Sequence, residues 1–311
     1  MSENTPNFNF YDQTYFKSYN LDKAMQYQLN LLDSLDLFTR AHCENVATIV
    51  CNLCRKLHLS KGFTEYCIIC AFLHDIGKQF IPPEVLQKPG KLTEEEYEII
   101  KKHTTLGYKL CLKDPKLRPY HAGVYYHHES LDGTGYPQGL TKKDIPFEAQ
   151  IIRIADEYDA LVHKRQYKSH IGITDALKII IEHTQPSPNA PKGTGYDKAG
   201  KVSKSIVKKL FKVVIDDIEY EISCTFDYVK YLEEEIKRYR EIEKYIKKKN
   251  NSKKEKDIAS CEQYINMLLK PDESIENFYT LYDEAKNAYE IRKNILENLD
   301  NEIKLIKKLK V

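Results

Sequence analysis

The chain has 311 residues, and its 48 basic and 46 acidic side chains leave a net charge of +2. This balance gives no general attraction to nucleic acid polymers or to membrane surfaces, so an anionic ligand needs a local cluster of cations. No apolar run reaches the roughly 18 residues of a membrane span, and residues 7–19 lack the order of a signal peptide. We therefore expect a cytoplasmic protein with no membrane span.

After a tail over residues 1–20, apolar residues recur at three- and four-residue spacings, which is typical of amphipathic helices. The predicted helices cover residues 21–32, 39–57, 64–73, 93–112, 119–128, 149–163 and 174–182. Thr93 and Glu96 have the spacing of a capping box. Residues 130–145 hold three glycines and a proline close together and predict an irregular loop. No segment reads as a convincing strand, so we predict an all-α fold.

The composition changes beyond about Phe226, where glycine disappears and Lys, Glu, Tyr and Ile dominate. Apolar stripes over residues 229–246 and 278–306 predict two further helices. We expect residues 247–256 to form a charged loop, and Pro271 to separate a short helix from the last one. The segment 226–311 should be a helical hairpin or bundle that folds on itself, on the preceding domain or on a second copy as a homodimer.

Eight cysteines are expected to be reduced in the cytoplasm. Cys51 with Cys54, and Cys67 with Cys70, have the spacing of zinc-binding pairs. Both pairs, however, lie inside apolar helical segments without the turn glycines of a zinc knuckle. Core thiols are therefore the favoured interpretation, with a structural metal site as the alternative.

A His-Asp pair, His74-Asp75, ends the apolar stretch 68–73 of the third predicted helix. Burying an imidazole beside a carboxylate is costly unless a metal or another charge compensates it. Further candidates lie on the neighbouring predicted helices. They are His42, His103, His127, His128 and Asp156. A lone histidine on a helix is more often a core residue, but this set points to a site.

Together with Lys78, the loop Gly135-Tyr136-Pro137 and Asp159, this order of motifs resembles the HD-GYP family of metal-dependent phosphodiesterases over about residues 35–168. The resemblance implies an HD-type helical bundle domain over residues 21–225, followed by the helical appendage. It also implies two divalent metal ions. One would be bound by His42, His74, Asp75 and Asp156, and the other by His103, His127 and His128, with Asp75 bridging the two.

The donor types and one departure from the family refine the metal prediction. Imidazole and carboxylate donors without thiolates suit iron or manganese. Some family members use a glutamate four residues before the first histidine for a third ion. Phe38 occupies that position here and cannot ligate, so we expect two ions.

The same resemblance implies hydrolysis of cyclic di-GMP to linear pGpG, with GMP as a further product, through a hydroxide that bridges the metal ions. Asp75 and Lys78 are the expected catalytic residues. The expected substrate contacts are Lys78, Gly135, Tyr136, Asp159, Arg165 and Lys168, of which Asp159 could instead orient a metal ligand. The loop at Gly135-Tyr136-Pro137 is expected to contact a cyclase-domain protein.

Two other functions stay open. The domain could hydrolyse another cyclic dinucleotide, such as cyclic GMP-AMP, or another nucleotide phosphoester. It could instead be a cyclic-dinucleotide receptor or scaffold with little turnover.

Overall fold

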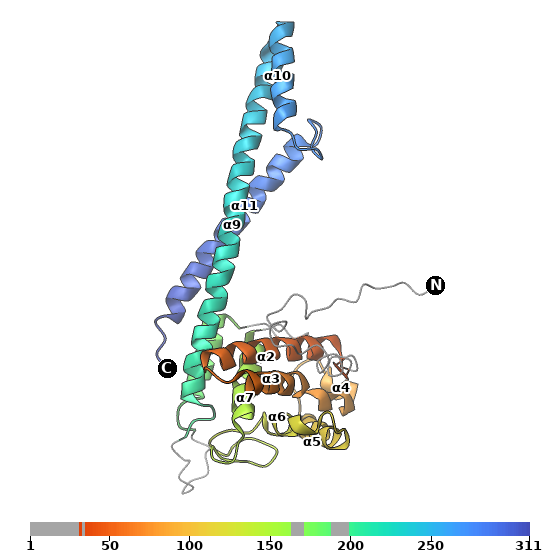
Figure 1. Cartoon of the computed structure of the whole chain (residues 1–311), viewed down its shortest axis with the longest axis vertical. Helices are drawn as coiled ribbons and strands as arrows, with labels where there is room; N and C mark the ends of the chain where they lie inside the picture. Colours follow the sequence, from red (N-terminus) through yellow and green to blue (C-terminus); the bar gives the residue numbers. More distant parts are fainter. Residues whose placement is uncertain (1–30, 33–34, 163–170, 188–198) are drawn as a thin grey trace, which may run out of the picture. The chain divides into compact units, whose positions relative to one another are not determined.

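The computed structural model describes residues 31–32, 35–162, 171–187 and 199–311 (Figure 1). Within these ranges the regular secondary structure is helical, and the strand-like pairing is limited to an isolated bridge between Asp132 and Thr141. The all-α prediction is confirmed. None of the described helices is long and apolar enough to cross a membrane.

The chain divides into two compact units, Met1–Val214 with Leu309–Val311, and Ile215–Lys308. The helix α9 (Lys204–Asn251) begins in the first unit and continues in the second. The composition change near Phe226 therefore lies inside a helix. This position does not mark a break in the backbone.

The first unit is built from helices of moderate length joined by short connections. They are α2 (Leu37–Lys56), α3 (Lys61–Leu73), η3 (Ile76–Phe80), α4 (Pro83–Leu86), α5 (Glu94–Lys113), η4 (Arg118–Tyr120), α6 (His121–Tyr126), α7 (Phe147–Val162) and α8 (Ile173–Glu182). α2 packs against α3 and α7, while α5 packs against η3 and α6. The predicted helix at 119–128 is a 3-10 turn followed by α6, so His127 and His128 lie just beyond a helix end.

Side-chain caps explain where the main helices begin. The Asp36 carboxylate accepts hydrogen bonds from the backbone N–H groups of Phe38 and Thr39, each at 3.1 Å, and starts α2. Thr93 and Glu96 form the predicted capping box at the start of α5. These side chains satisfy N–H groups that have no partner inside the helix.

α3 is the most deeply buried of these helices, because all of its residues from Cys67 to Leu73 lie in the core. Because this part of α3 is buried on all sides, the residues that directly follow its end also lie in the protein interior. Those residues are His74 and Asp75, whose relative exposures are 0% and 1%. The imidazole of His74 and the carboxylate of Asp75 therefore both carry the full cost of desolvation.

The paired cysteines lie in the same core. Cys51, Cys54, Cys67 and Cys70 are buried and form no disulfide. Within the described ranges, the groups of side chains able to bind a metal contain no cysteine. These observations favour core thiols over the zinc alternative.

The second unit is a bundle formed by the C-terminal part of α9 with α10 (Glu255–Leu268) and α11 (Phe278–Ile306). Its core includes Ile242, Ile265 and Phe278, each fully buried. Pro271 lies between α10 and α11, as predicted. The segment 226–311 thus contains a helical bundle with its own core.

The prediction of a charged loop over residues 247–256 is wrong. α9 continues to Asn251, and α10 already begins at Glu255. Two lysines of this segment are paired with acids: Lys247 lies 2.9 Å from Glu243 on the same helix, and Lys249 lies 2.7 Å from Glu262 on α10. Pairing of this kind lets a run of like charges remain helical.

Candidate metal centre

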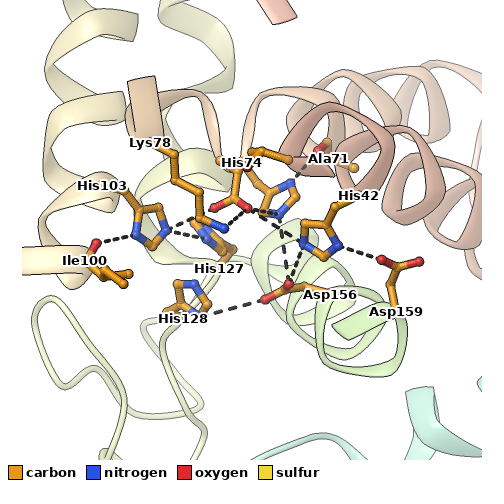
Figure 2. A network of polar contacts seen from close by, with 12 residues as sticks. His42, Ala71, His74, Lys78, Ile100, His103, His127, His128, Asp156 and Asp159 are labelled. Atoms are coloured by element: carbon orange, nitrogen blue, oxygen red, sulfur yellow. Dashed lines mark hydrogen bonds and ion pairs between the residues drawn. The ribbon is translucent and has the colours of Figure 1, made fainter. Parts of the chain in front are cut away.

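Residues from five segments of the first unit meet at one buried centre (Figure 2): α2, the junction of α3 and η3, α5, the residues after α6, and α7. Their ligand atoms form two groups, in each of which the atoms lie within 4.8 Å of one another. One group is Asp75, His103, His127 and His128, and the other is His42, His74 and Asp75. Asp75 belongs to both groups, which is the arrangement expected for a carboxylate between two cations.

Asp156 on α7 joins the group around His42. Its Oδ1 lies 3.0 Å from His42 Nε2 and 4.0 Å from His74 Nε2. All seven residues expected as metal ligands are therefore brought together. Phe38 is 50% exposed on α2, and the described residues offer these two ligand groups and no third.

Asp75 reaches the centre because the backbone changes direction after α3. Asp75 has φ −98° and ψ 6°, and the chain then continues as the 3-10 helix η3. Gly77 allows η3 to approach α5 closely, since a Cβ at this position would lie 1.9 Å from His103 O and 2.6 Å from Gly107 N. This contact brings Asp75 Oδ1 within 3.3 Å of His103 Nε2.

The hydrogen bonds of three histidines determine which ring nitrogen is free. Each donates its Nδ1–H to the carbonyl three residues earlier, since a carbonyl can only accept. They are His74, His103 and His127, with Nδ1–O distances of 2.6, 2.7 and 2.8 Å. In the neutral form of each ring, Nε2 therefore carries the lone pair, as in metal-bound histidines whose second nitrogen is held by a carbonyl.

Among the residues that the structure describes, these Nε2 atoms have no hydrogen-bond partner that fits a lone pair. The Nε2 atoms of His103 and His127 face each other at 3.2 Å, where two acceptors cannot form a hydrogen bond. His74 Nε2 and Asp75 Oδ1 are buried without a hydrogen-bond partner. Buried polar atoms without a partner are costly, and a cation bound to the neutral rings and to Asp75 would satisfy them together. The donor set therefore fits divalent metal ions.

His42 is oriented by Asp159. The Nδ1 atom of His42 lies 2.6 Å from Asp159 Oδ2, and the Asp159 side chain is 2% exposed. A carboxylate on the far nitrogen holds the ring with Nε2 turned toward Asp75 and Asp156. The Asp159 carboxylate is enclosed behind His42. This position argues against a substrate contact and favours the other predicted role of Asp159, which is to orient a metal ligand.

Burial keeps the imidazoles around His103 neutral. It lowers the pKa of His103 to about 4, and it lowers the pKa of His127 and His128 well below the usual value. Neutral imidazole is the form that binds a metal ion. No proton therefore has to leave these three imidazoles before a metal ion binds, over the physiological pH range.

Carboxylates reverse this effect at His42 and His74. Burial lowers the pKa of both imidazoles, but hydrogen bonds to Asp156 and Asp159 outweigh it and raise the pKa of His42 to about 9. Asp75 likewise raises the pKa of His74 to about 10. A metal ion would replace these protons, so its binding here is expected to release protons.

A pocket of about 410 Å³ opens onto the centre. Lys78, Gly135 and Tyr136, expected from the sequence as substrate contacts, line it together with His103 and His128. The Lys78 ammonium is paired with the Asp75 carboxylate. Arg165 and Lys168 lie outside the described residues.

The glycine-rich loop packs closely against the backbone of Glu129 and Ser130, which precede it. A Cβ at Gly135 would lie 2.2 Å from the amide nitrogen of Ser130, so only glycine fits. The adjoining Tyr136 ring stacks on His128, with 4.7 Å between ring centroids and 24° between planes. One face of the Tyr136 ring is therefore already used against a candidate metal ligand.

Three residues in or next to the pocket are not among those that the sequence predicts for the site. The buried Glu129 carboxylate accepts hydrogen bonds from the backbone N–H groups of Gln138 and Leu140, at 2.7 and 2.8 Å, and holds the loop. Arg153 lines the pocket one helical turn before Asp156, a spacing that could have identified it. Lys201 also lines it, but its position depends on a long-range hydrogen bond from Leu131 N that leaves no sequence pattern.

The HD domain family model matches residues 26–186, which is more than half of the chain. This chain belongs to the HD domain family. The resemblance inferred from the ordered motifs is thereby confirmed.

Three relatives illustrate the similarity. A cyclic di-GMP phosphodiesterase of Thermotoga maritima is 38% identical over 155 residues, covering 49% of this chain and 42% of the relative. A cyclic di-GMP phosphodiesterase response regulator of Xanthomonas campestris is 41% identical over 142 residues, covering 45% and 37%. A 3'3'-cGAMP-specific phosphodiesterase of Vibrio cholerae is 34% identical over 182 residues, covering 58% and 42%. The chain thus spans less than half the length of these relatives.

Proposed function

We propose that the protein is a metal-dependent phosphodiesterase that hydrolyses cyclic di-GMP to linear pGpG, which it then cleaves to GMP. The observation that carries this proposal is the pair of ligand groups that share the Asp75 carboxylate at the base of a pocket. Relatives named as cyclic di-GMP phosphodiesterases support the choice of substrate.

We propose iron or manganese as the two ions, because the donors are nitrogen and oxygen without a thiolate. The ligands would be His42, His74, Asp75 and Asp156 for one ion, and His103, His127 and His128 with Asp75 for the other. Divalent ions at these positions supply Lewis acidity to a phosphodiester and make water nucleophilic at neutral pH.

The chain's own residues would bind and orient the substrate. Lys78 borders the pocket, where its ammonium can approach a phosphate oxygen and neutralise charge. Tyr97 and Tyr136 also line the pocket and offer rings against which a guanine base can pack. Arg165 and Lys168 remain predicted substrate contacts.

The proposal is tested by incubating anaerobically purified, manganese- or iron-loaded protein with cyclic di-GMP and separating the products by chromatography. We expect pGpG to form first. Asp75→Asn should abolish turnover and lose both ions, whereas Asp227→Asn, at an exposed position on α9, should retain both. The absence of cleavage of any cyclic dinucleotide by fully loaded protein would exclude the enzymatic function.

A second candidate substrate is 3'3'-cGAMP, because a relative specific for it matches 58% of this chain. A side-by-side comparison of kcat/KM for the two cyclic dinucleotides decides between them. Tight binding without turnover at full metal loading would favour the receptor or scaffold function instead.

Three further properties remain predictions. They are a cytoplasmic location, a cyclase-domain partner at the Gly135-Tyr136-Pro137 loop, and a homodimer through the C-terminal helices.

A further inference from the structure

Arg153 makes a contact that conflicts with the metal-binding role of its neighbour. It lies on α7, lines the pocket and places Nη1 3.1 Å from His128 Nδ1. A guanidinium is charged at every physiological pH and has only donors. His128 Nδ1 must therefore accept this hydrogen bond.

The consequence follows from the single proton of a neutral imidazole. If Nδ1 of His128 accepts from Arg153, the proton lies on Nε2, and the ring has no second lone pair. A metal ion at Nδ1 would take the lone pair that Arg153 uses. A metal ion at Nε2 would move the proton to Nδ1, where it would face another donor. The Arg153–His128 hydrogen bond and a metal ion on His128 therefore exclude each other.

A guanidinium released from His128 remains at the pocket wall. Arg153 Nε lies 3.9 Å from Glu157 Oε2 on the next turn of α7, and Glu157 is itself paired with His183. Arg153 Nε is buried and has no hydrogen-bond partner among the described residues. The guanidinium therefore has an N–H donor that is not used, and α7 fixes the backbone position from which the side chain extends.

Two further features indicate what the released group would bind. Lys78 and Lys201 also line this pocket, so three cationic side chains border it. Cations next to metal ions repel one another unless an anion lies between them, and the planar guanidinium fork matches phosphate oxygens.

We propose that Arg153 exchanges partners. It holds His128 in the metal-free centre and, once a divalent ion takes that histidine, binds an oxygen of a phosphate group in the pocket. This inference rests on the proposed function to the extent that it places a phosphoester there.

The first half of the exchange is tested by manganese affinity, measured by competition with a chelator. Arg153→Met removes both the competing donor and a positive charge, whereas Arg153→Gln removes the charge and leaves only a shorter, neutral donor. We expect each to bind manganese about tenfold more tightly than wild type, with unchanged stoichiometry, because a hydrogen bond to a charged group is worth at least that factor. A weaker affinity, or the loss of one ion, would mean that Arg153 helps His128 to bind metal and would overturn the exchange.

The second half is tested by titrating inorganic phosphate into manganese-loaded protein in a calorimeter. We expect both variants to bind phosphate about tenfold more weakly than wild type. Phosphate affinity equal to that of wild type would refute the role in the pocket. Arg240→Met, at an exposed position on α9, is the matched control and should change neither affinity.

Neither measurement uses turnover of a cyclic dinucleotide. Failure of the proposed function would appear as absent cleavage by wild type, whereas failure of the exchange would appear in these affinities. Thermal unfolding of each variant establishes that it is folded, and two substitutions of different chemistry keep the test decisive if one of them does not fold.

Discussion

At the scale of single residues, four of the five histidines of the centre are oriented by a hydrogen bond at Nδ1. His74, His103 and His127 use a carbonyl of their own segment, and His42 uses the Asp159 carboxylate. A carbonyl contact is local and needs only a helical turn. The Asp159 contact joins residues 117 positions apart, so it depends on the packing of α2 against α7.

Asp159→Asn is predicted to weaken metal binding at the His42 side of the centre by about 10- to 100-fold, because His42 loses its charged acceptor. Chelator competition measures this change directly. An Asp144→Asn variant, in an exposed part of the loop, serves as control. If Asp159 contacted substrate instead, metal affinity would stay at the wild-type value and only KM would rise.

At the scale of secondary-structure elements, the centre depends on how closely η3 packs against α5. Gly77 is the residue that permits this packing, because the three atoms nearest to an added Cβ all belong to the backbone. Side chains can rotate away from a clash, but two packed backbones cannot.

Gly77→Ala is therefore predicted to lower the free energy of unfolding by about 1–3 kcal/mol or more. Gly62→Ala is the matched control, since it lies on α3 with no atom within 4 Å of the added Cβ. That variant should be neutral or more stable by up to about 1 kcal/mol, as expected for alanine in a helix. Chemical denaturation of both proteins provides the comparison, and equal stability would argue against the close approach.

The connection between α10 and α11 depends on a different kind of contact. Glu273 accepts hydrogen bonds from Arg238 at 2.6 Å, from Tyr239 Oη at 2.7 Å and from Lys270 N at 2.9 Å. Arg238 above all lowers the pKa of Glu273 to about 2, from its usual 4.5. The negative charge of Glu273 therefore stabilises the folded state.

This shift predicts a pH-dependent effect of Glu273→Gln. Because the folded pKa lies below the unfolded one, the stabilisation is present above pH 4.5 and is lost as the pH falls toward 2. The difference in thermal stability between wild type and Glu273→Gln should be largest near neutral pH and should shrink over that window. A difference that is the same at pH 6 and pH 3 would contradict the assigned role.

At the scale of the whole molecule, two units with separate cores share one chain. The candidate metal centre lies entirely in the first unit. Metal binding stabilises only the unit that contains the ligands, and the effect increases with the ratio of free ion to Kd.

Removal of metal with a chelator is therefore predicted to lower the unfolding temperature of the first unit and leave residues 215–308 unaffected. At a free ion concentration of about 100 times Kd, the stabilisation lost is about 2.7 kcal/mol. Hydrogen exchange read by mass spectrometry with and without manganese resolves the two units. Equal changes in protection across residues 215–308 would show that the units respond together, and Asp75→Asn should remove the metal effect altogether.

The sequence by itself determined the helical class, most helix positions, the capping box and the residue types of the centre. These properties follow from local periodicity and from the chemistry of side chains, both of which can be read along the chain. It also placed the ordered motifs in their family. It failed at residues 247–256, where α9 continues to Asn251, α10 begins at Glu255, and Lys247 and Lys249 are paired with acids.

Only the tertiary structure decided how these residues act together. It placed Asp75 in both ligand groups, turned Asp159 toward His42 instead of the pocket, and brought Arg153 against His128. Each of these contacts joins segments that are distant in sequence. Their distances depend on the packing of whole helices, and no spacing along the chain encodes that packing.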